Sequence, residues 1–214
     1  MQAEIKVEQI TSEIEKIYKP LYQDICYIHT KWGIFRQLYV SDKNTVDILN
    51  KSGALFFRIT QELLVDDIVL SLSRLTDPSK TFKKDNLSLE QLVDAIDESK
   101  FPKLKDEASI QLENARIKCS FAREIRNKKI AHNDLTHRLQ PKVSLYSKVT
   151  TTTIDDALLS IRELINKVAM SFEGSTVYYE ILISDNHVKK MIKRFQNAEE
   201  YWKIIRDSHN FQKS

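Results

Sequence analysis

SGALFFRITQELLVDDIVLSLSRLT, residues 52–76, is the most apolar segment of the chain that has a helical pattern. Apolar side chains recur along it at helical spacing, among them Phe56, Ile59, Leu63 and Leu70. The segment runs into the pair Asp77–Pro78, and a proline disfavours helix at the residue before it. The sequence therefore predicts a long helix that starts near residue 52 and ends before Pro78.

The part of the chain upstream of this helix also has helical periodicity. Apolar residues recur every three or four positions up to Tyr18, Pro20 interrupts the pattern, and the pattern resumes over residues 21–40. It is typical either of two helices or of one helix kinked at Pro20. A polar break over residues 41–44 then separates this part from the apolar helix.

Two further helices are predicted downstream of the apolar segment. A lysine-rich loop over residues 79–85 leads to Ser88, and Gln91 three residues later completes a capping-box signature for a short helix that ends at about Asp97. Pro102 stands where a first-turn proline belongs and opens a long helix that can run to about Ala131.

Helical periodicity is absent from residues 133–153, which we expect to form a long loop. Thr153 or Asp155 can cap the helix that follows, and Gly174 stands where helices commonly end. The sequence therefore predicts another amphipathic helix between these positions.

The composition favours helices over strands, because only three glycines and four prolines are available for turns. We predict an all-α protein, an up-down bundle of four or more helices with extra terminal helices. Residues 1–214 are expected to form a single domain with its core at about 50–173. Residues 175–214 would be a C-terminal appendage, in which β-branched and aromatic residues favour a short strand before a final helix at about 187–206.

Charge and cysteine content limit the classes of function. The net charge of +3, from 33 basic and 30 acidic residues, is too balanced to indicate nucleic-acid binding by itself, so any polyanion contact must be local. Cys26 and Cys119 lie inside helical patterns and suggest neither a disulfide framework nor a metal site, which fits a reducing compartment. With no signal-like or membrane-spanning segment in the sequence, we expect a cytoplasmic protein that does not contact the membrane.

The densest basic cluster that contains a histidine is REIRNKKIAHND, residues 123–134. Glycine-rich phosphate loops, HExxH, CxxC and GxSxG motifs are all missing from the sequence. Arginine grips phosphate oxygens with a fixed charge, and histidine transfers protons near neutral pH. Together they can cleave RNA without a metal, because the ribose 2′-hydroxyl supplies the nucleophile.

The segment RNKKIAH, residues 126–132, resembles the R-x4-6-H motif of HEPN domains, including the polar residue that typically follows the arginine, here Asn127. SLSRLTDP (71–78), NLSLEQLV (86–93) and RNKKIAHND (126–134) resemble, in order and spacing, the abortive-infection, AbiU-like branch, which is associated with phage resistance. The resemblance covers roughly residues 50–170.

This resemblance implies a HEPN-like helical bundle that forms a homodimer and acts as a metal-independent endoribonuclease leaving cyclic-phosphate ends. Arg126 and His132 would be catalytic, with Asn127 assisting, and no metal or cofactor would be needed. Partners would be RNA, a second copy of the chain, and an antitoxin or other defence protein. The RNA-binding candidates around the motif are Arg123, Lys128 and Lys129.

The motif departs from the family pattern in one respect and raises one geometric question. HEPN toxins with a nucleotidyltransferase antitoxin commonly carry a tyrosine two positions after the histidine, where this chain has Asp134, so control by that modification is not expected. On a straight α-helix Arg126 and His132 lie about 120° apart. Catalysis then needs a kink, a helix end near His132 or a wide cleft.

Ordinary structural roles stand beside the catalytic ones. His132 could cap a helix or extend the apolar stripe of Ile117, Phe121 and Ile125. Arg126 could form a surface ion pair with Glu124 or another carboxylate, which contributes little stability.

A second polar pair, Arg74 and Asp77, lies at the end of the apolar helix, where a structural role in fixing the helix end is the simplest interpretation. The rival to ribonuclease activity is a non-catalytic helical scaffold, or a module that binds RNA or a partner protein, because a fold alone does not specify activity.

Overall fold

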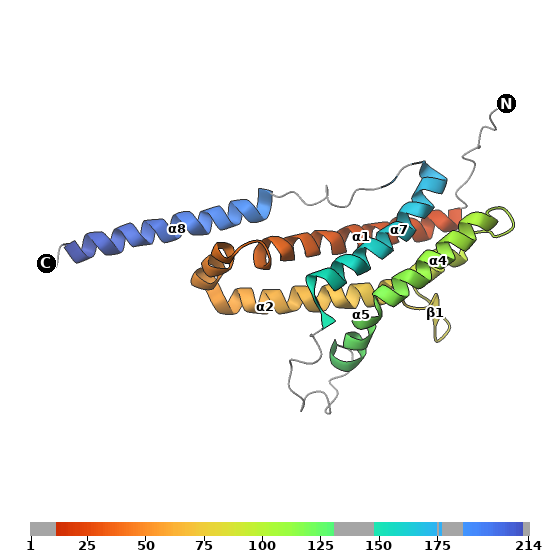
Figure 1. The fold of residues 1–214 in the computed structure, drawn as a ribbon, viewed down its shortest axis with the longest axis horizontal. Helices are drawn as coiled ribbons and strands as arrows, with labels where there is room; N and C mark the ends of the chain where they lie inside the picture. The colour runs from red at the N-terminus through yellow and green to blue at the C-terminus, as the bar shows by residue number, and fades with distance from the viewer. Residues whose placement is uncertain (1–11, 131–147, 175, 177–185, 212–214) are drawn as a thin grey trace. The chain divides into compact units, whose positions relative to one another are not determined.

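The computed structural model describes residues 12–130, 148–174, 176 and 186–211, and confirms the predicted all-α fold (Figure 1). Its α-helices are α1 (Ser12–Tyr39), α2 (Lys43–Leu75), α3 (Leu89–Asp94), α4 (Pro102–Lys118), α5 (Ser120–Ile125), α7 (Thr151–Glu173) and α8 (Asn186–Phe211). The π-helix η1 (Arg126–Ile130) continues α5, and the strands β1 (Lys80–Thr81) and β2 (Lys84–Asp85) form one short antiparallel pair.

The chain divides into two compact units, and α1 and α2 contribute to both of them. One unit comprises Met1–Ile28 and Asp66–Tyr179, and the other comprises His29–Val65 and Glu180–Ser214. All residues of the candidate site that the structure describes lie in the first unit.

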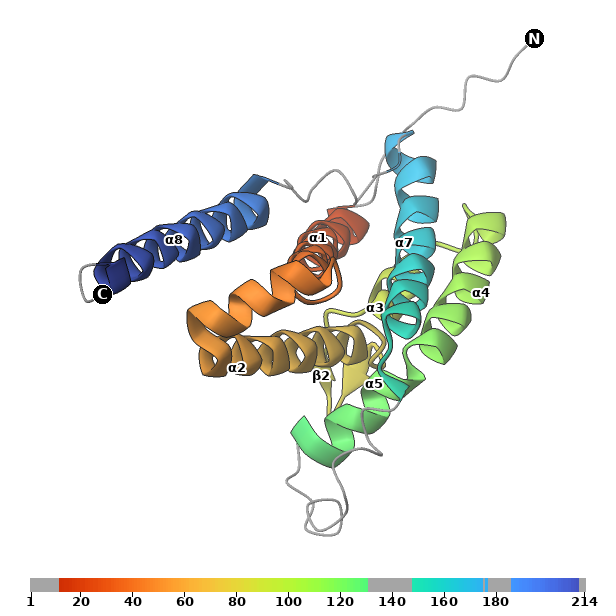
Figure 2. The same ribbon diagram turned by 60° about the vertical axis from the view of Figure 1, so that its left-hand side comes forward.

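In the first unit α4 packs along α7 (Figure 2). Two ion pairs tie these helices together, Lys118 Nζ to Asp156 at 2.9 Å and Lys167 Nζ to Glu107 at 3.0 Å. The core between the elements of this unit is aliphatic. Its fully buried members include Ile68, Leu72, Leu89, Leu92, Ala108, Ile125, Ile154 and Ile161.

The second unit has its own apolar cluster, which joins α8 to the end of α1 and the first half of α2. Its buried members are Leu38, Leu49, Phe57, Val188 and Ile192. The Tyr39 hydroxyl also donates a hydrogen bond of 2.9 Å to the Phe57 carbonyl. The first turns of α8 are therefore part of this core.

The first two long helices agree with the sequence at some ends and differ at others. α1 is one helix with Pro20 inside it, which resolves the alternative left open by the sequence. α2 ends at Leu75, as the Asp77–Pro78 pair predicts, but it begins at Lys43 rather than near residue 52, because Asp42 caps it through the Thr45 N–H at 2.8 Å. Non-helical backbone at Gly53 (φ 170°, ψ 65°) marks a kink near the predicted start.

A β-hairpin replaces the loop predicted over residues 79–85. Lys80 pairs with Asp85 and Thr81 with Lys84, and Phe82 and Lys83 between them have positive φ of 46° and 66°. Positive φ at both central residues is what a type I′ turn requires. It costs a non-glycine residue roughly 1–2 kcal/mol, so this turn is strained.

The two helices after the hairpin start as predicted. The Ser88 side chain accepts a hydrogen bond of 3.3 Å from the Gln91 N–H and caps α3, which ends at Asp94 rather than at about Asp97. Pro102 lies in the first turn of α4.

The predicted continuous helix from Pro102 to Ala131 is wrong, because it breaks at Cys119 and changes type at Arg126. The break also divides the predicted apolar stripe. Phe121 and Ile125 are buried, whereas Ile117 is 62% exposed. The apolar residues that lie in the core are therefore those after the break, on α5.

The N-cap of α7 is Thr150, not Thr153 or Asp155, although Thr153 takes part as the third helical residue of a reciprocal capping box. Gly174 ends this helix in the left-handed conformation (φ 64°), as predicted. α8 extends to Phe211, beyond the predicted end at about residue 206. The strand expected at 175–184, His132 and most of the loop expected at 133–153 lie outside the described residues. Among the helices that the structure describes, none is both long and apolar enough to span a membrane.

Candidate active site at the end of helix α2

The basic residues singled out in the sequence lie on α5 and η1. Arg123 is in α5, whereas Arg126, Asn127, Lys128 and Lys129 form four of the five residues of η1. Single-turn π-helical insertions occur frequently at functional sites. The i→i+5 bonding of η1 makes this turn wider than a turn of α-helix.

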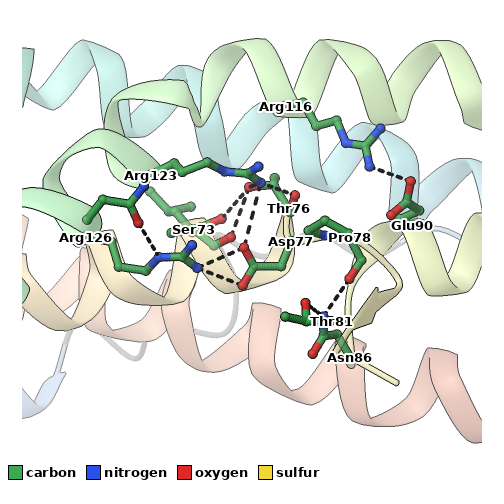
Figure 3. Close-up of polar contacts among 12 residues, drawn as sticks. Ser73, Thr76, Asp77, Pro78, Thr81, Asn86, Glu90, Arg116, Arg123 and Arg126 are labelled. Atoms are coloured by element: carbon green, nitrogen blue, oxygen red, sulfur yellow. Dashed lines mark hydrogen bonds and ion pairs between the residues drawn. The ribbon is translucent and has the colours of Figure 1, made fainter. Parts of the chain in front are cut away.

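Arg126 is held by Asp77, which lies just beyond the end of α2 (Figure 3). Arg126 Nη1 donates to both carboxylate oxygens of Asp77, at 2.8 Å each. Both side chains are largely buried, with 23% of the arginine and 22% of the aspartate exposed. The ion pair therefore joins the end of α2 to the first residue of η1 in a place where water screens it only partly.

Arg123 binds the same helix end from the preceding turn (Figure 3). Its Nη2 donates to the Thr76 carbonyl oxygen and lies 3.5 Å from Thr76 Oγ1 and 3.8 Å from the Asp77 carboxylate. Thr76 is buried, and its hydroxyl is bonded back to the Leu72 and Ser73 carbonyls at 3.2 Å. A cation at the last carbonyls of a helix also complements the helix dipole.

Asn127 contacts Arg126 rather than the backbone. Its Oδ1 accepts a hydrogen bond of 3.3 Å from Arg126 Nε. With Nε on Asn127 and Nη1 on Asp77, the third guanidinium nitrogen, Nη2, has no hydrogen-bond partner among the described residues. The arginine is thus oriented by two neighbours.

The sequence suggested that Asp77 pairs with Arg74, and the structure corrects this partner. Asp77 does fix the end of α2 against the bundle, but through Arg126 and Arg123. The Arg74 side chain is exposed, and its backbone carbonyl accepts the Asp77 N–H at 3.1 Å. Neighbours in sequence are brought together by the helix, whereas Asp77 and Arg126 meet only because α5 packs beside the end of α2.

A second carboxylate, Glu124 of α5, directly follows Arg123 and binds two lysines. Lys128 Nζ donates to one of its oxygens at 2.6 Å, and Lys148 Nζ donates to the other at 2.9 Å. The hydrogen bonds from Lys128, and then from Lys148, lower the pKa of Glu124 to about 2. Lys128, predicted to contact RNA, is therefore already paired in this structure, and the side chain of Lys129 lies outside the described residues.

Glu90 connects the hairpin to α4. Its carboxylate accepts a hydrogen bond of 2.5 Å from the Ser79 N–H and one of 2.6 Å from Arg116 Nη2. Burial raises the pKa of Glu90, but the hydrogen bonds from Arg116 and Ser79 outweigh burial and leave the pKa below its ordinary value. The segment after Asp77 is thereby fixed to the framework that carries α5.

Within the part of the chain that the structure describes, no group of three or more His, Cys, Asp or Glu side chains could hold a metal ion. Cys119, at the start of α5, is buried, and burial raises the pKa of its thiol to about 12. A thiol that stays protonated at neutral pH is a poor nucleophile.

Sequence reasoning found the arginines but missed what Asp77 does. The sequence does contain a signal for a contact between these segments, because SLSRLTDP and RNKKIAHND each place charged residues at the end of a predicted helix. The structure brings these two motifs together at Asp77 and Arg126. It does not test the distance from Arg126 to His132, because His132 lies outside the described residues.

Comparison with models of known protein families identifies a family for this chain. The family model HEPN_AbiU2, described as AbiU2, matches residues 11–192, a range that includes both motifs. No curated protein and no solved structure matches the chain.

Proposed function

Because the chain belongs to the HEPN_AbiU2 family, we propose that it is a metal-independent endoribonuclease that acts as a toxin or effector in abortive infection by phage. The observation that carries this proposal is the hydrogen bonding of the Arg126 guanidinium. Its guanidinium is oriented by Asp77 and Asn127, and Nη2 is left without a partner among the described residues. Two arginines around one carboxylate also leave one uncompensated positive charge at this point.

In the proposed reaction, Arg126 binds the scissile phosphate and stabilises the negative charge that develops on its oxygens. His132 takes part in proton transfer. The ribose 2′-oxygen forms a bond to phosphorus and loses its proton to a base, while the bond from phosphorus to the 5′-oxygen breaks and that oxygen gains a proton from an acid. The products are a 2′,3′-cyclic phosphate and a 5′-hydroxyl.

The remaining residues of the cluster have supporting roles in this proposal. Asn127 positions Arg126 through the bond to Nε. Arg123, Lys128 and Lys129 would contact flanking RNA, and Lys128 would exchange Glu124 for phosphate when RNA binds.

A homodimer completes the site in this proposal. Transesterification requires a base at the nucleophile and an acid at the leaving oxygen, yet the motif contains one histidine. A twofold axis between two RNKKIAH segments would place the two copies of His132 beside one phosphate, because a twofold interface is self-complementary. An antitoxin or another defence protein would restrain the activity in the cell.

The rival function, a non-catalytic scaffold or a binding module, draws on the same ion pair. If the bond between Asp77 and Arg126 only fastens α5 to α2, the site needs no substrate. Cleavage assays separate the two, because a structural ion pair predicts unfolding on substitution and a catalytic arginine predicts inactivity in a folded protein.

The decisive experiment incubates purified protein with defined RNAs and analyses the ends of the products. Cleavage with cyclic-phosphate ends should persist in a chelator. Arg126→Ala and His132→Ala should each lower the rate by at least about 100-fold, with unchanged helical circular dichroism, whereas Arg194→Ala on α8 is the matched control. Loss of cleavage in chelator that magnesium restores would contradict the mechanism.

Subunit exchange tests the dimer. Because both copies of His132 serve one phosphate in this proposal, excess His132→Ala protomer should suppress wild-type cleavage under subunit exchange, since each mixed dimer keeps only one of the two histidines. A fully active protein that sediments as a monomer at the assay concentration would exclude the dimeric site.

A further inference from the structure

The β1–β2 hairpin presents an aromatic side chain to solvent. Phe82 at its tip is 97% exposed, the highest value among the exposed large apolar side chains of the described residues. Three exposed lysines surround it in sequence, Lys80, Lys83 and Lys84. An aromatic ring with this exposure and these neighbours adds nothing to the core of the fold, and it requires another explanation.

The hairpin is held firmly at its base. Asn86 Nδ2 donates to the Pro78 carbonyl at 2.8 Å and to Thr81 Oγ1 at 2.7 Å (Figure 3). The Asn86 N–H also donates to the Ser79 carbonyl at 2.8 Å. Glu90 fixes the Ser79 N–H from α3. The tip is therefore presented from an anchored base.

The turn residues are poor choices for stability alone. Phe82 and Lys83 occupy the left-handed region, where asparagine and glycine would fit better. Residues kept in such conformations against their preference cluster at binding and catalytic sites. This strain is consistent with a ring and a charge that are needed at the tip.

The hairpin begins next to the candidate active site. Pro78 follows Asp77 directly, and five residues of chain limit the distance between the Cα atoms of Asp77 and Phe82 to at most about 18 Å. A single strand of the length bound by small nucleic-acid-binding domains, about 4–16 nucleotides, can reach both.

Together these features match the chemistry of single-stranded RNA. Non-specific single-strand sites combine cations along the backbone with aromatic rings on which bases stack. Lys83 and Lys84 have no carboxylate partner among the described residues, whereas Lys80 lies 3.7 Å from Asp85 in an exposed pair. A lone aromatic ring among lysines lacks the contiguous apolar surface that a protein partner needs.

We propose that the hairpin is a contact surface for single-stranded RNA, in which Phe82 stacks on a base while Lys83 and Lys84 bind phosphates beside the Arg126 site. This inference rests on the proposed ribonuclease function and assigns part of the substrate path. It places unpaired RNA, rather than a duplex, as the substrate class, because only an unstacked base can meet the ring.

The test uses a fluorescein-labelled single-stranded RNA 12-mer, a length within the range of about 4–16 nucleotides of such sites. Binding is measured by anisotropy in a His132→Ala background, so that the RNA stays intact. Phe82→Ala should weaken binding by about 5- to 100-fold, the loss of one stacked base. Phe82→Trp should retain the affinity and show tryptophan quenching on binding. Phe56→Ala removes a ring that is 66% exposed on α2 and should leave RNA binding unchanged.

The lysines are tested by salt dependence. Lys83→Ala combined with Lys84→Ala should reduce the slope of log K against log salt by about 1.4, since each single-strand phosphate contact contributes about 0.7. Lys51→Ala combined with Lys103→Ala removes the same charge elsewhere and should leave the slope unchanged.

The outcomes separate this inference from the proposed function. If wild-type protein cleaves RNA but the Phe82 and lysine variants bind the 12-mer as tightly as their controls, the hairpin assignment is wrong and the ribonuclease remains. If binding depends on Phe82 but wild-type protein never cleaves, the hairpin assignment holds and the ribonuclease fails. No binding of the 12-mer, or a hairpin that captures a protein partner but not RNA, overturns the hairpin assignment, whereas the ribonuclease proposal stands or falls with the cleavage assay.

Discussion

Two carboxylates, Asp77 and Glu124, each bind two basic side chains, and each binds at least one from α5 or η1. The two clusters differ in how far their side chains are exposed to solvent. Asp77, with 22% of its side chain exposed, holds Arg126 and Arg123, and Arg123 also donates to the carbonyl of the buried Thr76. Glu124, with 35% exposed, holds Lys128 and Lys148, and Lys148 is 64% exposed.

The difference shows how the same charges give either a fixed site or an adaptable surface. Guanidinium is planar and presents its donors in a fixed arrangement, so Asp77 orients Arg126 as well as neutralising it. Ammonium groups are flexible point charges, and pairs near solvent are weak and exchange with water and salt. We therefore assign positioning to the Asp77 cluster and exchangeable RNA contacts to the Glu124 cluster.

Exchanging arginine and lysine should give the largest difference in RNA cleavage between the two clusters. Arg126→Lys keeps the charge but loses the fork geometry, and it should lower RNA cleavage by at least about tenfold. Lys128→Arg should change cleavage by less than about twofold. Rates on one defined RNA measure both, and equal rates for Arg126→Lys and wild-type protein would show that charge alone suffices.

Removing each carboxylate should give the next largest difference between the clusters, in the free energy of unfolding. Asp77→Ala leaves a partly buried arginine without its partner and should lower the free energy of unfolding by about 1–3 kcal/mol. Glu124→Ala should lower it by less than about 1 kcal/mol because solvent screens that cluster.

Urea denaturation measures both values, and a double-mutant cycle of Asp77→Ala with Arg126→Ala isolates the pair. A coupling energy near zero would mean that this ion pair does not hold α5 to α2.

The rate at which Cys119 is labelled also reports how firmly α5 is held to α2, and we expect a smaller difference between the clusters in this rate. The thiol is 1% exposed and its pKa is raised to about 12 by burial, so alkylation at pH 8 should require local opening of α5. In a Cys26→Ser background, Asp77→Ala should speed labelling several-fold, whereas Glu124→Ala should not. Mass spectrometry of quenched samples gives the rates, and equal acceleration by both variants would remove the distinction between the clusters.

The pH dependence of Glu124 should give the smallest effect. Its pKa is about 2 in the folded protein against an ordinary value of 4.5, so the unfolded chain binds the proton more tightly. The stabilisation by Glu124 is therefore complete above about pH 4.5 and is lost as the pH falls toward 2.

Urea denaturation at stepped pH should show wild-type protein losing its small advantage over Glu124→Gln across this window. An advantage that persists at pH 2 would mean that the two lysines do not stabilise the ionised carboxylate.

Helix ends were predictable wherever neighbours in sequence decide them. Ser88 caps α3, Pro102 opens α4, and Gly174 closes α7, because each depends on hydrogen bonds or backbone angles within one turn. The apolar periodicity of residues 52–76 likewise predicted α2 to its last turn. The arginines of the candidate site were visible for the same reason, since Arg123, Arg126 and Asn127 follow one another along one short segment.

The sequence by itself therefore determined the all-α class, the helix ends that a local cap, proline or glycine decides, and the family to which the motifs point. Tertiary structure decided the break at Cys119, the π-helical turn at Arg126 and the choice of Asp77 as the partner of that arginine. Asp77 and Arg126 are 49 residues apart, and no local signal relates them. Their ion pair forms because burying Phe121 and Ile125 in the core sets where α5 runs, and α5 then brings the arginine to the end of α2.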